Sequence, residues 1–106
     1  MPDSPLAAWK EKFTFTESAE REFDKLPPDV QDAFLRAFPE FSTHPWRASA
    51  TLDVGTLRDM PGRWRLKVEG GHRGIYRSLQ GLPDFEMFET RDQVYERLRR
   101  YLSSRP

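Results

Sequence analysis

The sequence contains no cysteine and only two histidines among its 106 residues. Disulfide bonds and cysteine-based zinc sites are therefore excluded, and a histidine metal cluster is not expected. No stretch approaches the roughly 18–20 apolar residues that a membrane-spanning helix requires. Residues 1–10 also lack the apolar run of a signal peptide. We therefore expect a cytoplasmic protein without a metal ion, a cofactor or a membrane partner.

The chain also lacks a net charge, because 17 Lys and Arg residues balance 17 Asp and Glu residues. Neutrality argues weakly against a general affinity for nucleic acid. The charges are unevenly distributed, however, since residues 1–62 hold 7 basic and 11 acidic side chains, whereas residues 63–106 hold 10 basic and 6 acidic ones. This asymmetry is typical of a polyanion site, although an uneven solvated surface is the more common cause.

The length predicts one domain with one modest core. Residues 1–11 are predicted to be a loose N-terminal extension, residues 12–102 the domain, and residues 103–106 a tail. The sequence shows no internal repeat and no low-complexity block.

A short strand and two helices are predicted in the first half of the chain. Residues 12–16 alternate apolar and polar side chains as a strand does, and Thr16 or Ser18 then caps the first helix. The proline pair at 27–28 ends that helix and suits the first turn of the second one. Within the second helix Pro39 removes a hydrogen bond, so we expect a kink or an end just before it.

The second half is predicted to be mainly strands. Residues 42–62 form an irregular link that is rich in proline and glycine signals. Three antiparallel strands follow, at residues 64–69, 72–79 and 85–88, and residues 92–102 form a short C-terminal helix. The predicted fold class is therefore α+β: an N-terminal strand, a two-helix hairpin, a three-stranded antiparallel meander and the short helix.

The turn at the glycines 70–71 decides which side chains share a face of the first hairpin. A two-residue turn would pair Glu69 with His72 and place Arg73 and Arg77 among core side chains, where an unpaired charge is costly. A three-residue loop that includes His72 pairs Glu69 with Arg73 instead, and a glycine suits its positive-φ position. We predict the three-residue loop.

In that register one face of the hairpin is apolar and the other is basic, with Ile75 as an apolar exception. The charged side chains on the basic face are Arg65, Lys67, Arg73, Arg77 and a single acid, Glu69. Every half-buried sheet has a polar face, but ordinary polar faces mix charges, and like charges on adjacent strands repel. The predicted face therefore favours a visiting anion, such as a partner carboxylate or an RNA phosphate.

Five segments resemble the RelE/ParE toxin superfamily in their order and spacing. They are SAEREFDKL (18–26), LRDMP (57–61), WRLKV (64–68), GHRGIYR (71–77) and TRDQVY (90–95). The resemblance implies a RelE-like fold, in which the meander joins the first strand in one sheet. It also implies a toxin with an antitoxin protein as its partner. RelE-like members cut mRNA at the ribosome without a metal ion, whereas ParE-like members inhibit DNA gyrase.

The resemblance also implies site residues. Those that match the catalytic positions of RelE-like nucleases are basic or aromatic: Arg65, Lys67, Arg73, Arg91 and Tyr95. Glu89 departs from the family pattern, which has a basic residue there to protonate the leaving group, and Arg91 is the nearest substitute. Glu69, His72 and Arg77 remain further candidates.

Cleavage of RNA without a metal requires the 2′-hydroxyl to lose a proton and attack the phosphorus in line, while cations stabilise the developing charge. Arg65 and Arg73 would clamp the phosphate, Lys67 is a candidate base, and Tyr95 would stack on or orient a nucleobase. The alternative is a binding module without nuclease activity, either a gyrase inhibitor or a silent relative. Neutral charge and Glu89 favour that alternative.

Overall fold

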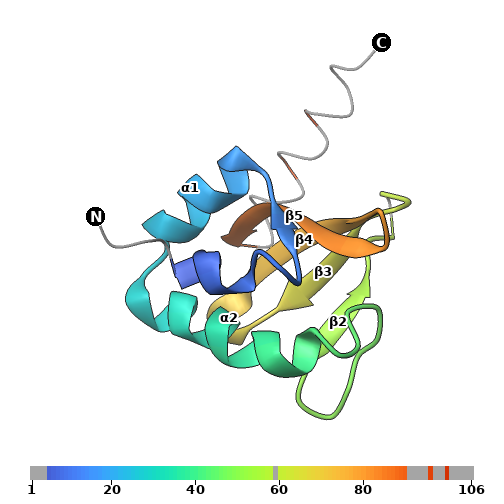
Figure 1. The fold of residues 1–106 in the computed structure, drawn as a ribbon, viewed down its shortest axis with the longest axis horizontal. Helices are drawn as coiled ribbons and strands as arrows, with labels where there is room; N and C mark the ends of the chain where they lie inside the picture. The colour runs from blue at the N-terminus through green and yellow to red at the C-terminus, as the bar shows by residue number, and fades with distance from the viewer. Residues whose placement is uncertain (1–4, 59, 91–95, 97–99, 101–106) are drawn as a thin grey trace.

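In residues 5–90, leaving out residue 59, the chain forms a five-stranded sheet and two α-helices (Figure 1). The computed structural model describes residues 5–58, 60–90, 96 and 100. The predicted α+β class is confirmed, whereas the predicted helix at 92–102 falls largely outside the described residues, as do Arg91 and Tyr95. No helix in the described ranges is long and apolar enough to cross a membrane.

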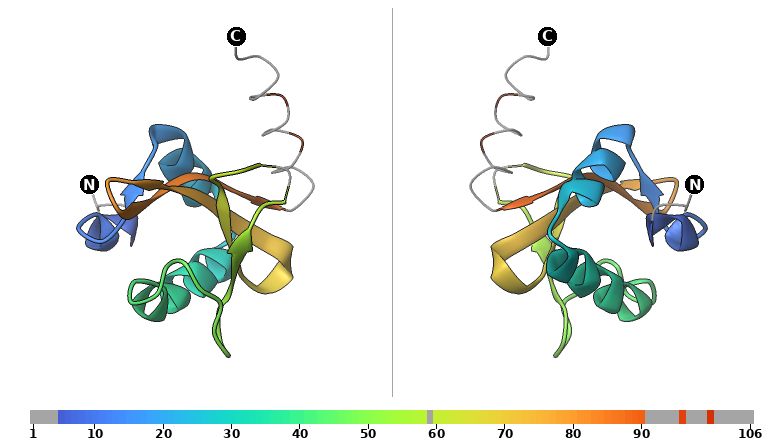
Figure 2. Two further views of the ribbon diagram at one scale, coloured as in Figure 1. Left: turned by 90° about the vertical axis from the view of Figure 1, so that its right-hand side faces the viewer. Right: turned by 90° about the vertical axis from the view of Figure 1, so that its left-hand side faces the viewer.

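The strands lie in the order β1-β5-β4-β3-β2. Their bounds are β1 (Thr14–Phe15), β2 (Asp53–Thr56), β3 (Trp64–Lys67), β4 (His72–Leu79) and β5 (Leu82–Thr90). β1 runs parallel to β5, and every other neighbouring pair is antiparallel. The N-terminal strand therefore joins the meander in one sheet, and Figure 2 shows that this sheet is strongly twisted.

The first helix, α1 (Glu17–Lys25), begins at one of the two predicted caps. The Thr16 Oγ1 accepts a hydrogen bond from the Ala19 amide at 3.0 Å, which satisfies one of the donors that a helix N-terminus leaves unpaired. Glu17 and Glu20 in the first turn and Lys25 in the last turn also match the helix dipole.

The second helix, α2 (Pro28–Phe41), continues through Pro39, so an end before that residue is a wrong prediction. Pro39 lacks only its own amide donor, and the helical pattern resumes after it. The Ser42 amide donates to the Phe38 carbonyl at 2.8 Å. The helix therefore keeps Phe38 and Phe41 buried on the side that faces the sheet.

The N-terminal segment forms a short 3-10 helix, η1 (Pro5–Trp9), where a loose extension is predicted. Leu6 is fully buried, and Trp9 stacks on Phe13 with ring centroids 5.7 Å apart. Burial of a large apolar side chain contributes about 1.5–3 kcal/mol of hydrophobic free energy. Two apolar residues three positions apart can therefore anchor one helical turn. This segment belongs to the core.

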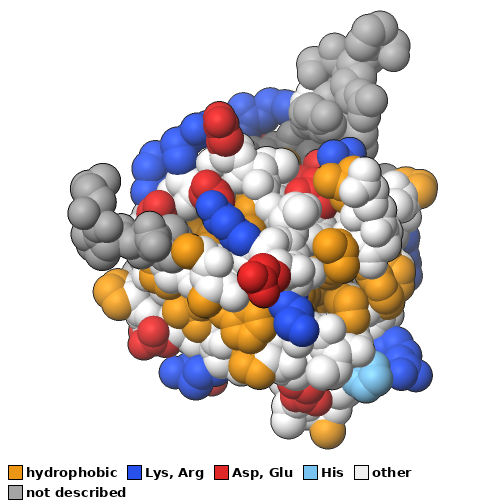
Figure 3. Space-filling model, in the orientation of Figure 1, with side chains coloured by type: hydrophobic (Ala, Val, Ile, Leu, Met, Phe, Trp, Pro, Cys, Tyr) orange, Lys and Arg blue, Asp and Glu red, His pale blue; other side chains and the backbone are white. Residues whose placement is uncertain are grey.

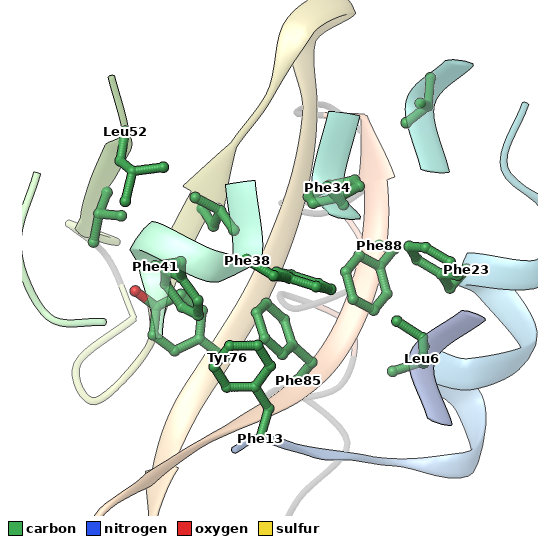
Figure 4. Packing of buried hydrophobic residues seen from close by; sticks show 14 residues of the cluster. Leu6, Phe13, Phe23, Phe34, Phe38, Phe41, Leu52, Tyr76, Phe85 and Phe88 are labelled. Carbon is green, nitrogen blue, oxygen red and sulfur yellow. The ribbon is translucent and has the colours of Figure 1, made fainter. Parts of the chain in front are cut away.

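Aromatic rings fill the space between the helices and the sheet (Figure 4). Ring pairs such as Phe13 and Phe38, or Phe34 and Phe88, meet edge to face with centroids 5.1 Å apart. This is a favoured geometry for aromatic contacts. The fully buried aromatic side chains are Phe13, Phe23, Phe34, Phe38, Phe41, Tyr76, Phe85 and Phe88.

The β3–β4 hairpin has the predicted faces but a different turn. Lys67 pairs with Arg73, so the predicted pairing of Glu69 with Arg73 is wrong by two positions. Glu69 instead begins a short 3-10 turn, η2 (Glu69–Gly71), in which both glycines adopt a φ of 79°. Because a shift of two residues preserves the alternation of side chains, the predicted division into two faces is confirmed.

β5 is longer than the predicted strand at 85–88 and contains a β-bulge. Ile75 pairs with Met87, and the register then shifts so that Glu86 is an extra residue. Phe85 and Phe88 therefore both reach the aromatic core although they are three positions apart. Met87 joins Ile75 in a separate buried cluster on the opposite face of the sheet.

β2 lies inside the segment that the sequence predicts to be an irregular link. It pairs with β3 and forms one edge of the sheet. Leu52 and Val54 are buried while Asp53 between them is exposed, which is the alternation of a strand. The strand has four residues and includes Gly55, and these features weaken its sequence signal.

Candidate functional site

The sheet face opposite the aromatic core carries a line of charged residues that crosses four strands. Asp53, Lys67, Arg73 and Glu89 are successive Cα partners on β2, β3, β4 and β5. We call these four residues the charged rung. Its two cations lie between two carboxylates, so the rung is neutral as a whole. Each pair of opposite charges on adjacent strands stabilises a sheet by about 0.2–1 kcal/mol.

Arg73 is the most buried member of the charged rung, with 8% of its surface exposed. Within the part of the chain that the structure describes, its Nε atom has no hydrogen-bond acceptor. A buried guanidinium is costly unless its donors are paired. Arg73 lies between Lys67 and Glu89 in register, so two cations are adjacent on this face of the sheet.

Arg65, the other cation on β3, is held by Asp53. The Arg65 Nη1 atom donates to Asp53 Oδ1 at 2.7 Å. The side chains keep 25% and 52% of their surface exposed, respectively, and a pair of this kind contributes about 0–1 kcal/mol to stability. The contact fixes the orientation of the guanidinium more than it stabilises the fold.

Lys67 lines a groove between α2 and the end of β3. The groove has a volume of about 390 Å³ and also contains Glu69, one of the predicted candidates. Its other lining residues are Ala33, Arg36, Ala37, Glu40, Thr51, Leu52, Asp53 and Val68. Hydrogen bonds from Thr51 and then Ser49 lower the pKa of Glu40 on the groove wall. Acidic, basic and apolar side chains therefore all line the groove.

Two ion pairs occupy the other end of this sheet face. Arg77 Nε lies 3.1 Å from Asp84 Oδ2, and the Thr14 hydroxyl donates to Asp84 Oδ1 at 2.7 Å. Arg63 Nε lies 2.6 Å from Glu86 Oε1, and burial raises the pKa of Glu86 although Arg63 opposes that shift. Arg77, a predicted candidate, thus ties β4 to β5 four residues away from the charged rung.

A small apolar cluster separates the two charged ends. Its members are buried and come from the link, β4 and β5: Leu57, Met60, Ile75 and Met87. Ile75, the predicted apolar exception on the basic face, is therefore part of a second core. The cluster confines the charged rung to one end of the sheet.

The prediction of an uncompensated basic face is wrong. The structure adds four carboxylates to the face that carries the cations: Asp53, Asp84, Glu86 and Glu89. The position of these carboxylates on this face was not predicted, because β2 was not recognised and because the length and bulge of β5 were not expected. The side of the molecule shown in Figure 3, which carries the helices, also displays both acidic and basic side chains.

The described structure brings three residues of the implied catalytic set together, namely Arg65, Lys67 and Arg73. The alternation of β4 places His72 on the opposite side, with Gly74 and Tyr76. Among the residues described, no group of three or more His, Cys, Asp or Glu side chains is arranged to hold a metal ion. Asp53 is the residue that sequence reasoning missed, and its only signal is its position between two apolar residues.

Comparison with known proteins finds similar structures but no similar sequence. No protein-family model and no curated protein matches the sequence. The structure is similar to a chain of the RelB–RelE antitoxin–toxin complex from Methanococcus jannaschii, with a TM-score of 0.62 and 13% identity. That match covers 78% of this chain and 95% of the other.

Two further solved structures show the same likeness. Escherichia coli RelE, as a mutant bound to an antitoxin RelBc peptide, has a TM-score of 0.61 and 21% identity over 81% of this chain and 90% of its own. The YoeB/ParE toxin from Agrobacterium tumefaciens has a TM-score of 0.59 and 18% identity over 74% and 96%. The chain therefore has the fold of these toxin structures.

Proposed function

From the fold shared with the RelE and YoeB/ParE structures, we propose that this chain is the toxin of a toxin–antitoxin pair and cuts mRNA at the ribosome. The observation that supports a nuclease is the pairing of Lys67 with Arg73 in the charged rung, with Arg65 two residues along β3. Three cations on one sheet face suit a phosphate whose negative charge increases during the reaction.

In the proposed reaction the 2′-oxygen attacks the adjacent phosphorus and the 5′-oxygen leaves, which yields a 2′,3′-cyclic phosphate and a 5′-hydroxyl. Arg73 and Arg65 contribute guanidinium groups that stabilise the charge on the phosphate. Lys67 between them accepts or orients the proton of the 2′-hydroxyl. Arg91 and Tyr95 keep their predicted roles as proton donor and base-stacking residue.

An antitoxin protein is the proposed partner. Its support is that the similar structures from Methanococcus jannaschii and Escherichia coli are toxins in complex with an antitoxin or an antitoxin peptide. Co-expression of this chain with a neighbouring small reading frame tests the partnership. A neutralising protein should co-purify with the chain and restore colony formation.

A gyrase inhibitor or a silent binding module is the second candidate, and the charged rung supports it. An RNA phosphate at Lys67 or Arg73 must compete with Asp53 and Glu89, which lie beside these cations in register. Each carboxylate reduces the affinity of the cations for a polyanion, because it already neutralises part of their charge. A protein target does not require an excess of positive charge.

Primer extension on mRNA with translating ribosomes tests the proposed function. We expect new 5′ ends with the wild type and none with the double variant Lys67→Ala/Arg73→Ala. The matched control is Lys12→Ala/Arg47→Ala, which removes the same charge from exposed positions away from this face. Cleavage that persists in the site variant contradicts the assignment, and relaxed DNA in a gyrase supercoiling assay favours the second candidate.

A further inference from the structure

Gly55 on the edge strand lies directly across from Arg65. The two residues are Cα partners in the β2–β3 ladder. A Cβ atom on Gly55 would lie 3.2 Å from Nη2, 3.3 Å from Cζ and 3.4 Å from Nη1 of Arg65. All three guanidinium atoms are thus close to the bare backbone of β2, so the planar group lies across the strand at the position where a side chain is missing.

Asp53 holds the same guanidinium from two residues earlier on β2. Its Oδ1 atom accepts the hydrogen bond from Arg65 Nη1 at 2.7 Å. In the described ranges, Nη1 is the guanidinium nitrogen of Arg65 that makes a hydrogen bond, so the Nε and Nη2 donors remain for another acceptor. A planar fork with five donors can bind a carboxylate and a phosphate oxygen together.

We propose that Asp53 and Gly55 are positioning residues for Arg65 in the RNA cleavage proposed above, on which this inference rests. Asp53 anchors one side of the guanidinium, and Gly55 lets it lie flat on the strand beside the charged rung. An arginine side chain has many rotamers, so a guanidinium that is fixed in advance loses less entropy when a phosphate arrives. Neither residue touches the substrate in this account.

Gly55→Val separates positioning from structural support. Gly55 has no positive φ, so valine fits the strand backbone without strain and has the higher strand propensity. We expect an unchanged or higher melting temperature, while the valine side chain displaces the guanidinium. The kcat for RNA cleavage should fall about tenfold to a hundredfold, as reacting groups moved by about 1 Å typically lose. Thr56→Val, on the same strand but the other face, should leave kcat unchanged.

Asp53→Asn separates positioning from charge. We expect a lower kcat because the anchor is weakened, together with an equal or lower KM because a carboxylate beside the phosphate site is removed. Asp32→Asn, which removes the same charge from an exposed position of α2, is the matched control and should change neither constant. A rise in KM at constant kcat, or a loss of kcat that follows the melting temperature, would overturn the proposal.

Side-chain NMR of Arg65 keeps this test independent of nuclease activity. The ¹⁵N signals of its guanidinium, assigned with Arg65→Lys, should be resolved in the wild type at low temperature because the pair with Asp53 slows rotation. They should broaden or merge in both Asp53→Asn and Gly55→Val. If the wild type cuts no RNA, the proposed function fails while these spectra still decide the positioning. Unchanged Arg65 signals in both variants would refute it.

Discussion

Among the glycines, Gly74 has the least room for an added Cβ atom. A Cβ there would lie 2.9 Å from Cε1 of Phe85 and 3.0 Å from Cε1 of Phe88, whereas non-bonded carbon atoms prefer about 3.5–4.0 Å. Both rings are almost fully buried in the aromatic core, so neither can move without disturbing its neighbours. Gly74→Ala therefore forces a rearrangement of the core.

The expected cost of Gly74→Ala is about 1–2 kcal/mol. Overpacking of a dense core costs about 1–3 kcal/mol, and the loss of chain entropy in the unfolded state returns about 0.4–1 kcal/mol. In urea denaturation this corresponds to a midpoint about 1 M lower, with the same m-value. The assay follows unfolding by tryptophan fluorescence and by circular dichroism.

Gly55→Ala is the matched control for Gly74→Ala. Both are strand glycines without positive φ, but the atoms nearest to the new Cβ of Gly55 belong to the flexible end of Arg65. This control should change the free energy of unfolding by less than about 0.5 kcal/mol or raise it. A Gly74→Ala protein as stable as the wild type would refute the bulged register that brings Phe85 and Phe88 together over β4.

Three further changes test local features of the fold by urea denaturation. Thr16→Ala should cost about 1 kcal/mol because it removes the helix cap, and Thr16→Ser should restore the stability. Tyr76→Phe should also cost about 1 kcal/mol because the phenol donates to the Pro45 carbonyl, and an ultraviolet titration should lose one phenol whose pKa burial has raised. Burial raises the pKa of Glu86 above its ordinary 4.5, so the folded protein holds that proton more tightly than the unfolded chain does. The stability of the wild type, measured relative to that of Glu86→Gln, should therefore fall as the pH rises from ~4 to ~7. A difference in stability that is independent of pH would contradict this.

The sequence was sufficient to predict those elements whose formation depends on neighbouring residues in the chain. The hydroxyl of Thr16 can cap only the helix that follows it, and the proline pair at 27–28 can only separate two helices. The alternation in β3 and β4 also determined which side chains share a face, because the cost of placing Arg73 and Arg77 among the apolar side chains of the aromatic core excluded the other arrangement. These predictions agree with the structure although the turn between the strands does not.

The features that could not be predicted depend on contacts between distant segments. The bulge at Glu86 follows from the need to bury both Phe85 and Phe88 against helices earlier in the chain. β2 is a strand because its backbone completes the edge of β3, and a four-residue strand with a glycine carries little signal of its own.

In the candidate site too, the features set by neighbouring residues were predictable and those set by distant segments were not. Its cations on β3 and β4 are adjacent through one hairpin, so the alternation found Arg65, Lys67 and Arg73. Its carboxylates arrive from strands whose pairing is set by the whole sheet, so Asp53 was not considered and the neutrality of the charged rung was not expected. The site is therefore less basic than the sequence alone predicts.

The chemical ends of the fragments from RNA cleavage test the central claim most directly. The purified wild type, with programmed ribosomes and a labelled mRNA, should yield fragments that end in a 2′,3′-cyclic phosphate, because attack by the 2′-hydroxyl needs no metal ion. The fragments should disappear with a folded Lys67→Ala/Arg73→Ala protein. Fragments with free 3′-hydroxyl ends, or cyclic-phosphate fragments that persist in the double variant, would contradict cleavage at the charged rung.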